Sequence, residues 1–363
     1  MLYKKTLSLS GIYIFLVATK CFSTGADSAA IKVSGYVDAY YAYYTDSVGI
    51  GKFQKFPSIS PRSNQFGLNT AQVTFQYDAE KVRALATLHY GDIPVSAWSG
   101  TFNNLMEAHA GVRLCKKVWL DAGFFRTHVG TEGLLPRENI TSSVSVNTIY
   151  EPYFESGVRL NYNPNDKLAV SFLILNGYNI YEDNNESKSV GALITYALGS
   201  KGSIGYSNYT GDDSPEEETI SHTRIHQSLF FNYQVKKLKI QIGGDYCVQM
   251  NSDTTHRETA SMISGVVSLK YQCCLRAAVY GRGELFNDPQ GFMSTLITDN
   301  KNRQTGYKLF GTTEGIEYKP TDNSYIRLES RQLITDKEQQ IFNWKGTIRN
   351  YRLEIMVNMG ISF

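Results

Sequence analysis

The chain has 363 residues, of which 42% are hydrophobic and 19% charged, and 36 Lys and Arg residues against 34 Asp and Glu residues give a net charge of +2. This balance excludes a strongly basic nucleic-acid-binding protein and an acidic disordered tail. A mean hydropathy of −0.29 excludes a polytopic helical membrane protein, because each spanning helix needs about 20 mostly apolar residues. A membrane β-barrel stays open, since only alternate strand residues must be apolar.

Residues 1–30 have the pattern of a secretory signal peptide, with two lysines before a short apolar run and small residues after it. We expect cleavage near Ala26 or Ala30, which leaves residues 31–363 as a single barrel domain. A signal anchor is the alternative. The apolar run is short for a bilayer span, however, and Lys20 ends it early.

From residue 31 onward the apolar residues recur with a period of two, and no stretch favours a long amphipathic helix. Such alternation is typical of β-strands whose two faces meet different surroundings. It is clearest where the opposite face is charged, as where Arg327 separates Ile326 from Leu328. In chain order the pattern predicts strands near residues 31–43, 71–77, 82–89, 106–113, 118–124, 154–162, 168–177, 188–198, 203–210, 223–233, 238–245, 261–271, 275–282, 306–318, 326–331 and 347–363.

The connections between these strands alternate strictly between short and long. Short turns lie at 78–81, 115–117, 163–167, 199–202, 235–237, 272–274 and 320–323. Long loops lie between them, near 45–65, 90–104, 126–150, 178–187, 211–222, 250–260, 285–305 and 332–346. Short turns at one end and long loops at the other are the layout of an outer-membrane barrel. The sequence therefore predicts an all-β fold, a closed antiparallel transmembrane β-barrel of about 16 strands with short periplasmic turns and long external loops.

The last predicted strand ends the chain in an aromatic residue. Phe363 continues the apolar face that carries Tyr351 and Ile361, while Glu354 and Asn358 lie on the opposite face. A terminal aromatic on an alternating strand resembles the signal by which the barrel-assembly machinery recognises outer-membrane proteins. A soluble β-sandwich also alternates, but it does not account for so regular a series of up-and-down strands.

A closed ring pairs every backbone N–H and C=O group, as lipid requires. Sixteen strands enclose a space too wide for side chains to fill, so we expect a water-filled channel. The charged strand faces then line the pore with Arg83, Glu107, His109, Arg113, Asp121, Glu155, Arg159, Arg276, Arg282, Glu284, Arg327, Glu329, Arg331, Arg352 and Glu354. Arginines outnumber carboxylates in this set, which favours a weak anion preference. The alternative for each residue is that it pairs across strands to stabilise the ring.

Patterns typical of other functions are weak. No CxxC or HExxH occurs, and the cysteines after residue 30 form no ordered disulfide framework, so we expect no metal, no cofactor and no catalytic residue. His226 and Ser228 share a strand face, as in barrel phospholipases, but no Asn-Gly follows the serine. The acidic residues at 212–218 are typical of a solvated loop, with a divalent ion bridging lipopolysaccharide as the alternative.

Six short segments carry a resemblance to a known protein family. They are 35–43 (GYVDAYYAY), 66–69 (FGLN), 107–111 (EAHAG), 119–125 (WLDAGFF), 153–160 (YFESGVRL) and 284–288 (ELFND). Spread over nearly the whole mature chain, they resemble a β-barrel porin family of Gram-negative outer membranes, the OmpL-like porins. The resemblance implies a barrel with a general porin role, in a family whose solutes are mostly unassigned. The adjacent Cys273 and Cys274 at a predicted periplasmic turn depart from it, without consequence for the fold.

The loop near residues 126–150 is the longest and follows the fifth strand. In porins of this size the loop at that position folds into the pore. We therefore expect its charged residues at a constriction, namely Arg126, His128, Glu132, Arg137 and Glu138. An ordinary surface loop is the alternative.

We thus expect an integral protein of the bacterial outer membrane, a porin for passive diffusion of small hydrophilic solutes, and not an enzyme. The alternatives are a substrate-selective channel of the same fold, an esterase- or phospholipase-like barrel enzyme, and a structural or adhesion barrel. The expected partners are outer-membrane lipid, lipopolysaccharide, the barrel-assembly machinery and small polar solutes, with no nucleic acid. The solute, the pore radius and the choice between monomer and homotrimer stay open.

Overall fold

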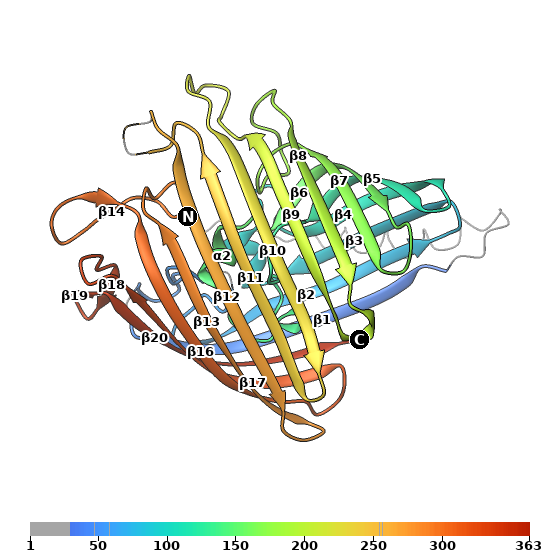
Figure 1. The fold of residues 1–363 in the computed structure, drawn as a ribbon. Helices are drawn as coiled ribbons and strands as arrows, with labels where there is room; N and C mark the ends of the chain where they lie inside the picture. The colour runs from blue at the N-terminus through green and yellow to red at the C-terminus, as the bar shows by residue number, and fades with distance from the viewer. Residues whose placement is uncertain (1–29, 47, 58, 254, 256) are drawn as a thin grey trace, which may run out of the picture.

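The computed structural model describes residues 30–363 apart from 47, 58, 254 and 256, so the predicted signal peptide lies outside the described residues except for Ala30. The strands close into one antiparallel barrel (Figure 1). In ring order they are β1 (Lys32–Tyr44), β2 (Gln65–Asp78), β3 (Val82–Tyr90), β4 (Leu105–Cys115), β5 (Val118–Arg126), β6 (Phe154–Tyr162), β7 (Leu168–Leu175), β8 (Ser189–Ala197), β9 (Gly202–Asp212), β10 (Thr223–Val235), β11 (Leu238–Gln249), β12 (Ala260–Gln272), β13 (Ala277–Asp288), β16 (Tyr307–Tyr318), β17 (Ser324–Thr335) and β20 (Tyr351–Ser362). The predicted fold class and the sixteen strands are confirmed.

The two faces of each strand differ as the alternation predicts. On β17, Arg327, Glu329 and Arg331 are 3%, 1% and 3% exposed, whereas Ile326 and Leu328 are 40% and 46% exposed. The ionic face is therefore directed into the ring and the apolar face outward. In a bilayer this apolar face contacts lipid, which removes the cost of exposing it to water.

The barrel closes where the first and last strands pair. β1 pairs with β20 from Tyr36 opposite Ser362 to Tyr44 opposite Glu354. At the end of the chain the backbone of Phe363 exchanges hydrogen bonds of 2.7 and 3.0 Å with Gly35. The Phe363 ring covers this glycine so closely that a Cβ atom there would lie 2.4 Å from it, so the seam requires Gly35.

The predicted alternation of turns and loops is also present, with short turns at one end of the barrel and long loops at the other (Figure 1). The external loops carry small elements, α1 (Asp92–Ala97) and the hairpins β14 (Ile297–Thr298) with β15 (Gln304–Thr305) and β18 (Phe342–Trp344) with β19 (Thr347–Arg349). No described helix is long and apolar enough to cross a membrane. Several predicted strand boundaries were wrong. The largest differences are that β2 begins at Gln65 rather than near residue 71 and that β13 ends at Asp288 rather than near residue 282. The final strand begins at Tyr351 rather than near residue 347, because Lys345 and Gly346 turn the chain with positive φ, and β13 begins at Ala277 rather than at residue 275.

Strand length divides the wall into two sectors. Strands β3 to β8 have 8 to 11 residues, and we call them the short-strand sector. Strands β9 to β20 of the ring have 11 to 13 residues, and β1 and β2, which follow β20 around the ring, have 13 and 14; together they form the long-strand sector. The loop that connects β5 to β6 starts and ends in the short-strand sector.

Candidate functional site

The longest connection, residues 127–153 between β5 and β6, folds into the interior of the ring, and we call it the inner loop. It contains the short helices η3 (Pro136–Glu138) and α2 (Val146–Tyr150), and its segment 139–148 is buried throughout. Hydrogen bonds join it to β9 and β11, which are separated by one strand, and to β17, which lies four strands further around the ring. A loop on the outer surface would not reach all three strands, so the inner loop crosses the lumen, where α2 lies behind β11 and β12 in Figure 1.

Carboxylates of the long-strand sector hold the tip of the inner loop. The backbone N–H groups of Ser142 and Ser143 donate to Glu329 over 2.6 and 2.9 Å, and that of Val146 donates to Glu284 over 2.6 Å. Such charge-assisted bonds are about twice as strong as neutral ones. The small hydroxyl side chains at the tip let its backbone approach the wall this closely.

Arginines of the same sector hold the rest of the loop. Arg282 donates to Glu132 over 3.1 Å, to the Thr141 hydroxyl over 2.8 Å and to the Ser143 carbonyl over 2.6 Å. Arg327 donates to the backbone carbonyls of Pro136, Thr141 and Asn139 over 2.8 to 3.2 Å. Because a guanidinium carries five donors in a fixed fork, one arginine fixes several points of the loop at once.

A second loop, residues 45–64, covers the end of β20 in the same way. Arg352 forms a close ion pair with Glu354 and donates to the Lys55 carbonyl over 2.5 Å. Asp46 lies 3.4 Å from the same guanidinium. Seven residues that the sequence places on the pore wall are thus at most 7% exposed, beneath these loops: Arg282, Glu284, Arg327, Glu329, Arg331, Arg352 and Glu354.

The short-strand sector carries charges that keep access to solvent. Arg83 donates to both oxygens of Asp121 over 2.7 and 2.5 Å, and Arg159 lies 3.6 Å from the same carboxylate. Gly111 lies between them on β4, where a Cβ atom would be 2.1 Å from an Asp121 oxygen. The glycine therefore lets Arg83 reach across β4. The two arginine side chains are 28% and 25% exposed, while that of Asp121 is fully buried.

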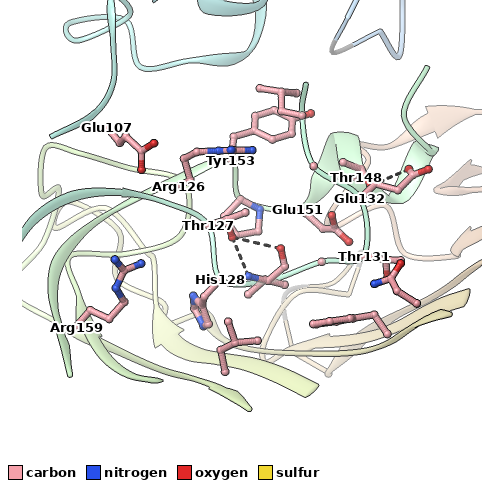
Figure 2. A pocket seen from close by; sticks show the side chains of 18 residues that line it. Glu107, Arg126, Thr127, His128, Thr131, Glu132, Thr148, Glu151, Tyr153 and Arg159 are labelled. Atoms are coloured by element: carbon pink, nitrogen blue, oxygen red, sulfur yellow. Dashed lines mark hydrogen bonds between the residues drawn. The ribbon is translucent and has the colours of Figure 1, made fainter. Parts of the chain in front are cut away.

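Two cavities lie against this sector. The first has a volume of about 400 Å³, with Arg126, His128 and Phe230 in its lining, and the second has about 500 Å³. The second is lined by the periplasmic half of the sector, including Arg83, His109, Asn161 and Ser171. Both cavities are lined by Glu107, Arg159 and Leu193, so they adjoin at these three residues. In Figure 2, Glu107, Arg126 and Arg159 lie on one side of the first cavity and Thr131 and Glu132 on the other.

The remaining predicted residues lie in several places. Arg126 pairs with Glu138 through bonds of 2.7 and 2.5 Å, and Arg137 lies over the Tyr36 ring at 4.3 Å. Glu155 is fully buried against His128. Arg113 is exposed near the periplasmic end of β4, and Arg276 is exposed in the turn between β12 and β13.

Several residues of the site were missed by the sequence analysis. Leu193 and Phe230 line the first cavity, yet their strands have no face assigned in the prediction, because apolar residues occur on both sides of them. Their sequence neighbours Ile194 and Leu229 are 42% and 56% exposed and therefore face outward. Strict alternation along the strand would have placed Leu193 and Phe230 on the inward face. Glu151 was also missed. Burial, together with the nearby carboxylates of Asp245 and Glu132, raises the pKa of Glu151 well above its usual range.

The His226 and Ser228 pair does not have the geometry of a hydrolase. His226 Nε2 lies 3.3 Å from Asp245 and Nδ1 lies 3.0 Å from the Tyr178 hydroxyl. Both ring nitrogens are therefore occupied, and none is left to accept the Ser228 proton as a general base would. The buried Ser228 hydroxyl has no hydrogen-bond partner among the described residues.

Solved structures with the same architecture are outer-membrane proteins. A loop L8 deletion mutant of OmpT, an outer membrane protein of Vibrio cholerae, aligns with a TM-score of 0.60 and 10% identity over 93% of this chain and 100% of its own. The outer membrane channel DcaP of Acinetobacter baumannii aligns with a TM-score of 0.60 and 12% identity over 92% and 97%. An anion-selective porin from Comamonas acidovorans aligns with a TM-score of 0.60 and 9% identity over 92% and 100%. At these identities the likeness shows the fold.

The family is shown by the sequence itself. A search of curated proteins finds no match. The sequence model of the family described as "Putative beta-barrel porin-2, OmpL-like" matches residues 30–363, which is nearly the whole described chain. The chain therefore belongs to the OmpL-like β-barrel porins, integral proteins of the outer membrane.

Proposed function

We propose that this porin lets small hydrophilic solutes diffuse passively along the short-strand sector, through the two adjoining cavities. The single observation that supports this path is the asymmetry of the interior. The inner loop is bonded to the long-strand sector by Glu284, Arg282, Arg327 and Glu329. The wall residues of both cavities come mainly from the short-strand sector, with Phe230 and Asn232 of β10 added at the first. The inner loop then narrows the channel from one side, as the constriction residues of the sequence prediction require.

We further propose a weak anion preference. Along the path, the guanidinium groups of Arg83 and Arg159 are partly exposed and share the fully buried carboxylate of Asp121. Arg126 is neutralised by Glu138, and Glu107 forms no ion pair among the described residues. Because Asp121 is buried, a passing ion meets the partly exposed guanidinium groups of Arg83 and Arg159 and the carboxylate of Glu107. Charge at the pore wall selects ions of the opposite sign.

Planar-bilayer recordings and liposome swelling test this function together. We expect stepwise KCl currents, and swelling rates in sugars that fall with sugar size. An uncharged pair of sugars of equal size but different identity should permeate equally. A strong difference between them would favour a substrate-selective channel of the same fold, and the absence of both currents and swelling in correctly folded protein would contradict a porin.

Interactions with the assembly machinery are proposed from the paired terminal strand that ends at Phe363. The acidic external loop gives less support for a divalent ion bridging lipopolysaccharide. Asp212 accepts hydrogen bonds from Ser214 and Ser221, and Asp213 accepts one from the Tyr178 N–H. These two carboxylates are already engaged by hydrogen bonds within and between the external loops.

A further inference from the structure

His128 lies at the N-terminal end of the inner loop, just after β5, and we call this end the root of the loop. Both ring nitrogens of His128 face acceptors. Nδ1 is 2.8 and 2.9 Å from the two carboxylate oxygens of Glu155, and Nε2 is 2.8 Å from the backbone carbonyl oxygen of Asn208. A carbonyl has no proton to donate, and neither has an ionised carboxylate. Both bonds therefore form only when the imidazole carries two protons and a positive charge.

The wall is shaped to receive this ring. The side chains of His128 and Glu155 are 3% and 0% exposed. On β8 the ring lies against Gly191, where a Cβ atom would be 2.4 Å from Nε2. Since both side chains are almost fully buried although His128 borders the first cavity, a bond that is lost leaves a buried polar group without its partner, which is costly.

The charged groups around the ring come mostly from one strand. β6 supplies Glu155, whose negative charge favours the imidazolium, and Arg159, whose positive charge disfavours it. β9 supplies the Asn208 carbonyl, and β8 supplies no charge at Gly191. The other charged groups of the shared cavity are Glu107 of β4, Arg126 at the end of β5, and Glu132 and Glu151 of the inner loop itself. Burial opposes the charge, but Glu155 outweighs it, and the pKa of His128 is raised above its ordinary 6.5.

We propose that the imidazolium of His128 is a positioning residue that holds the root of the inner loop on β6 and β9 and thereby sets the width of the channel. This inference rests on the proposed porin function. The other fastenings of the loop involve Arg282, Arg327, Glu284 and Glu329, and guanidinium groups do not lose their protons in this range. Compared with these arginine and glutamate fastenings, the root is thus attached through a cation that can lose its proton as pH rises above 6.5.

The direction of the pH effect follows because the charged imidazolium is the form that makes both hydrogen bonds. Because the folded-state pKa lies above 6.5, the attachment is complete below that pH and is lost as pH rises through the folded-state pKa. Deprotonation leaves one ring nitrogen without a hydrogen, so one of the two bonds breaks. We expect the freed root to move off the wall, with larger single-channel conductance and more current noise on the alkaline side.

Single-channel conductance between about pH 5 and pH 10 tests this. Wild-type protein should show an alkaline step. H128Q should lack the step, because glutamine does not titrate, and H128K should keep the low-conductance state to higher pH, because its cation still pairs with Glu155. H109Q is the matched control. His109 lines the second cavity, and its Nδ1 has no hydrogen-bond partner among the described residues, so its variant should retain the wild-type step.

E155Q supplies a second readout that a merely structural role would not move. Without the carboxylate the proton is held less tightly, so the midpoint of the step should shift to lower pH. Heat-modifiable gel mobility confirms that each variant has folded. A step that persists in H128Q, a midpoint unmoved in E155Q, or a conducting wild-type channel without any step would each overturn the inference and leave the porin function intact. A folded protein that conducts at no pH would instead overturn the porin function.

Discussion

Arg282 in the long-strand sector and Arg83 in the short-strand sector both lie on inward faces of the barrel wall, yet their surroundings differ. Arg282 is 3% exposed and directs its donors at the inner loop, whereas the Arg83 side chain is 28% exposed and pairs with its wall neighbour Asp121. The same residue type on the same face fastens a loop in one sector and faces the cavity in the other. What separates the two roles is whether a loop covers the residue.

The largest expected effect comes from removing a loop fastening. Arg282→Met should lower the free energy of unfolding by about 3–5 kcal/mol, because it leaves the buried carboxylate of Glu132 without its cation. Urea titration of the protein in lipid vesicles, followed by gel mobility, measures this. Arg276→Met is the matched control in an exposed turn, with an expected change within about 0.5 kcal/mol. Equal effects would contradict the role of Arg282 in holding the inner loop.

Deletion of residues 130–145 should widen the channel, because these residues form most of the inner loop. We expect single-channel conductance to rise about twofold or more, since the lumen of a barrel of this size is otherwise open. Planar-bilayer recordings of the deletion variant provide the measurement. Unchanged conductance would mean that the inner loop does not limit the path.

A smaller effect is expected from the exposed cations of the short-strand sector. Arg159→Gln should shift the reversal potential under a KCl gradient toward cation preference, because it removes one of the two exposed positive charges on the path. Arg327→Gln removes a covered arginine and should leave the reversal potential almost unchanged in the fraction that folds. Clear cation preference of the wild-type channel would contradict the proposed selectivity.

The smallest effect on the reversal potential is expected at the periplasmic end of the barrel. Arg113 is exposed near the periplasmic end of β4, where its guanidinium lies 5.3 Å from the Trp119 ring centroid. Arg113→Gln should change the reversal potential less than Arg159→Gln does, because solvent and salt screen an exposed charge. The same bilayer measurement, repeated at low and high salt, separates the two positions. A larger effect at Arg113 would move the selective region to the periplasmic mouth.

The alternation of residues such as Ile326 and Arg327 was enough to predict the strands, because a period of two depends only on which face meets lipid. The same pattern could not predict which part of the barrel interior the inner loop covers. The contact of Ser142 with Glu329 joins positions 187 residues apart, and no local pattern encodes it. Leu193 was missed for a related reason. An apolar residue cannot be recognised as inward-facing from the sequence unless the register of its strand is already known.

The location of the path is tested most directly by a matched pair of cysteine variants. Ser171 on β7 lines the second cavity, whereas Ser268 on β12 is an inward residue with 0% exposure. Ser171→Cys and Ser268→Cys are made with the exposed native cysteines replaced by serine, those being Cys115, Cys273 and Cys274. A charged thiol reagent should reduce the current through the Ser171→Cys channel and leave that through Ser268→Cys unchanged. The reverse result would contradict a path along the short-strand sector.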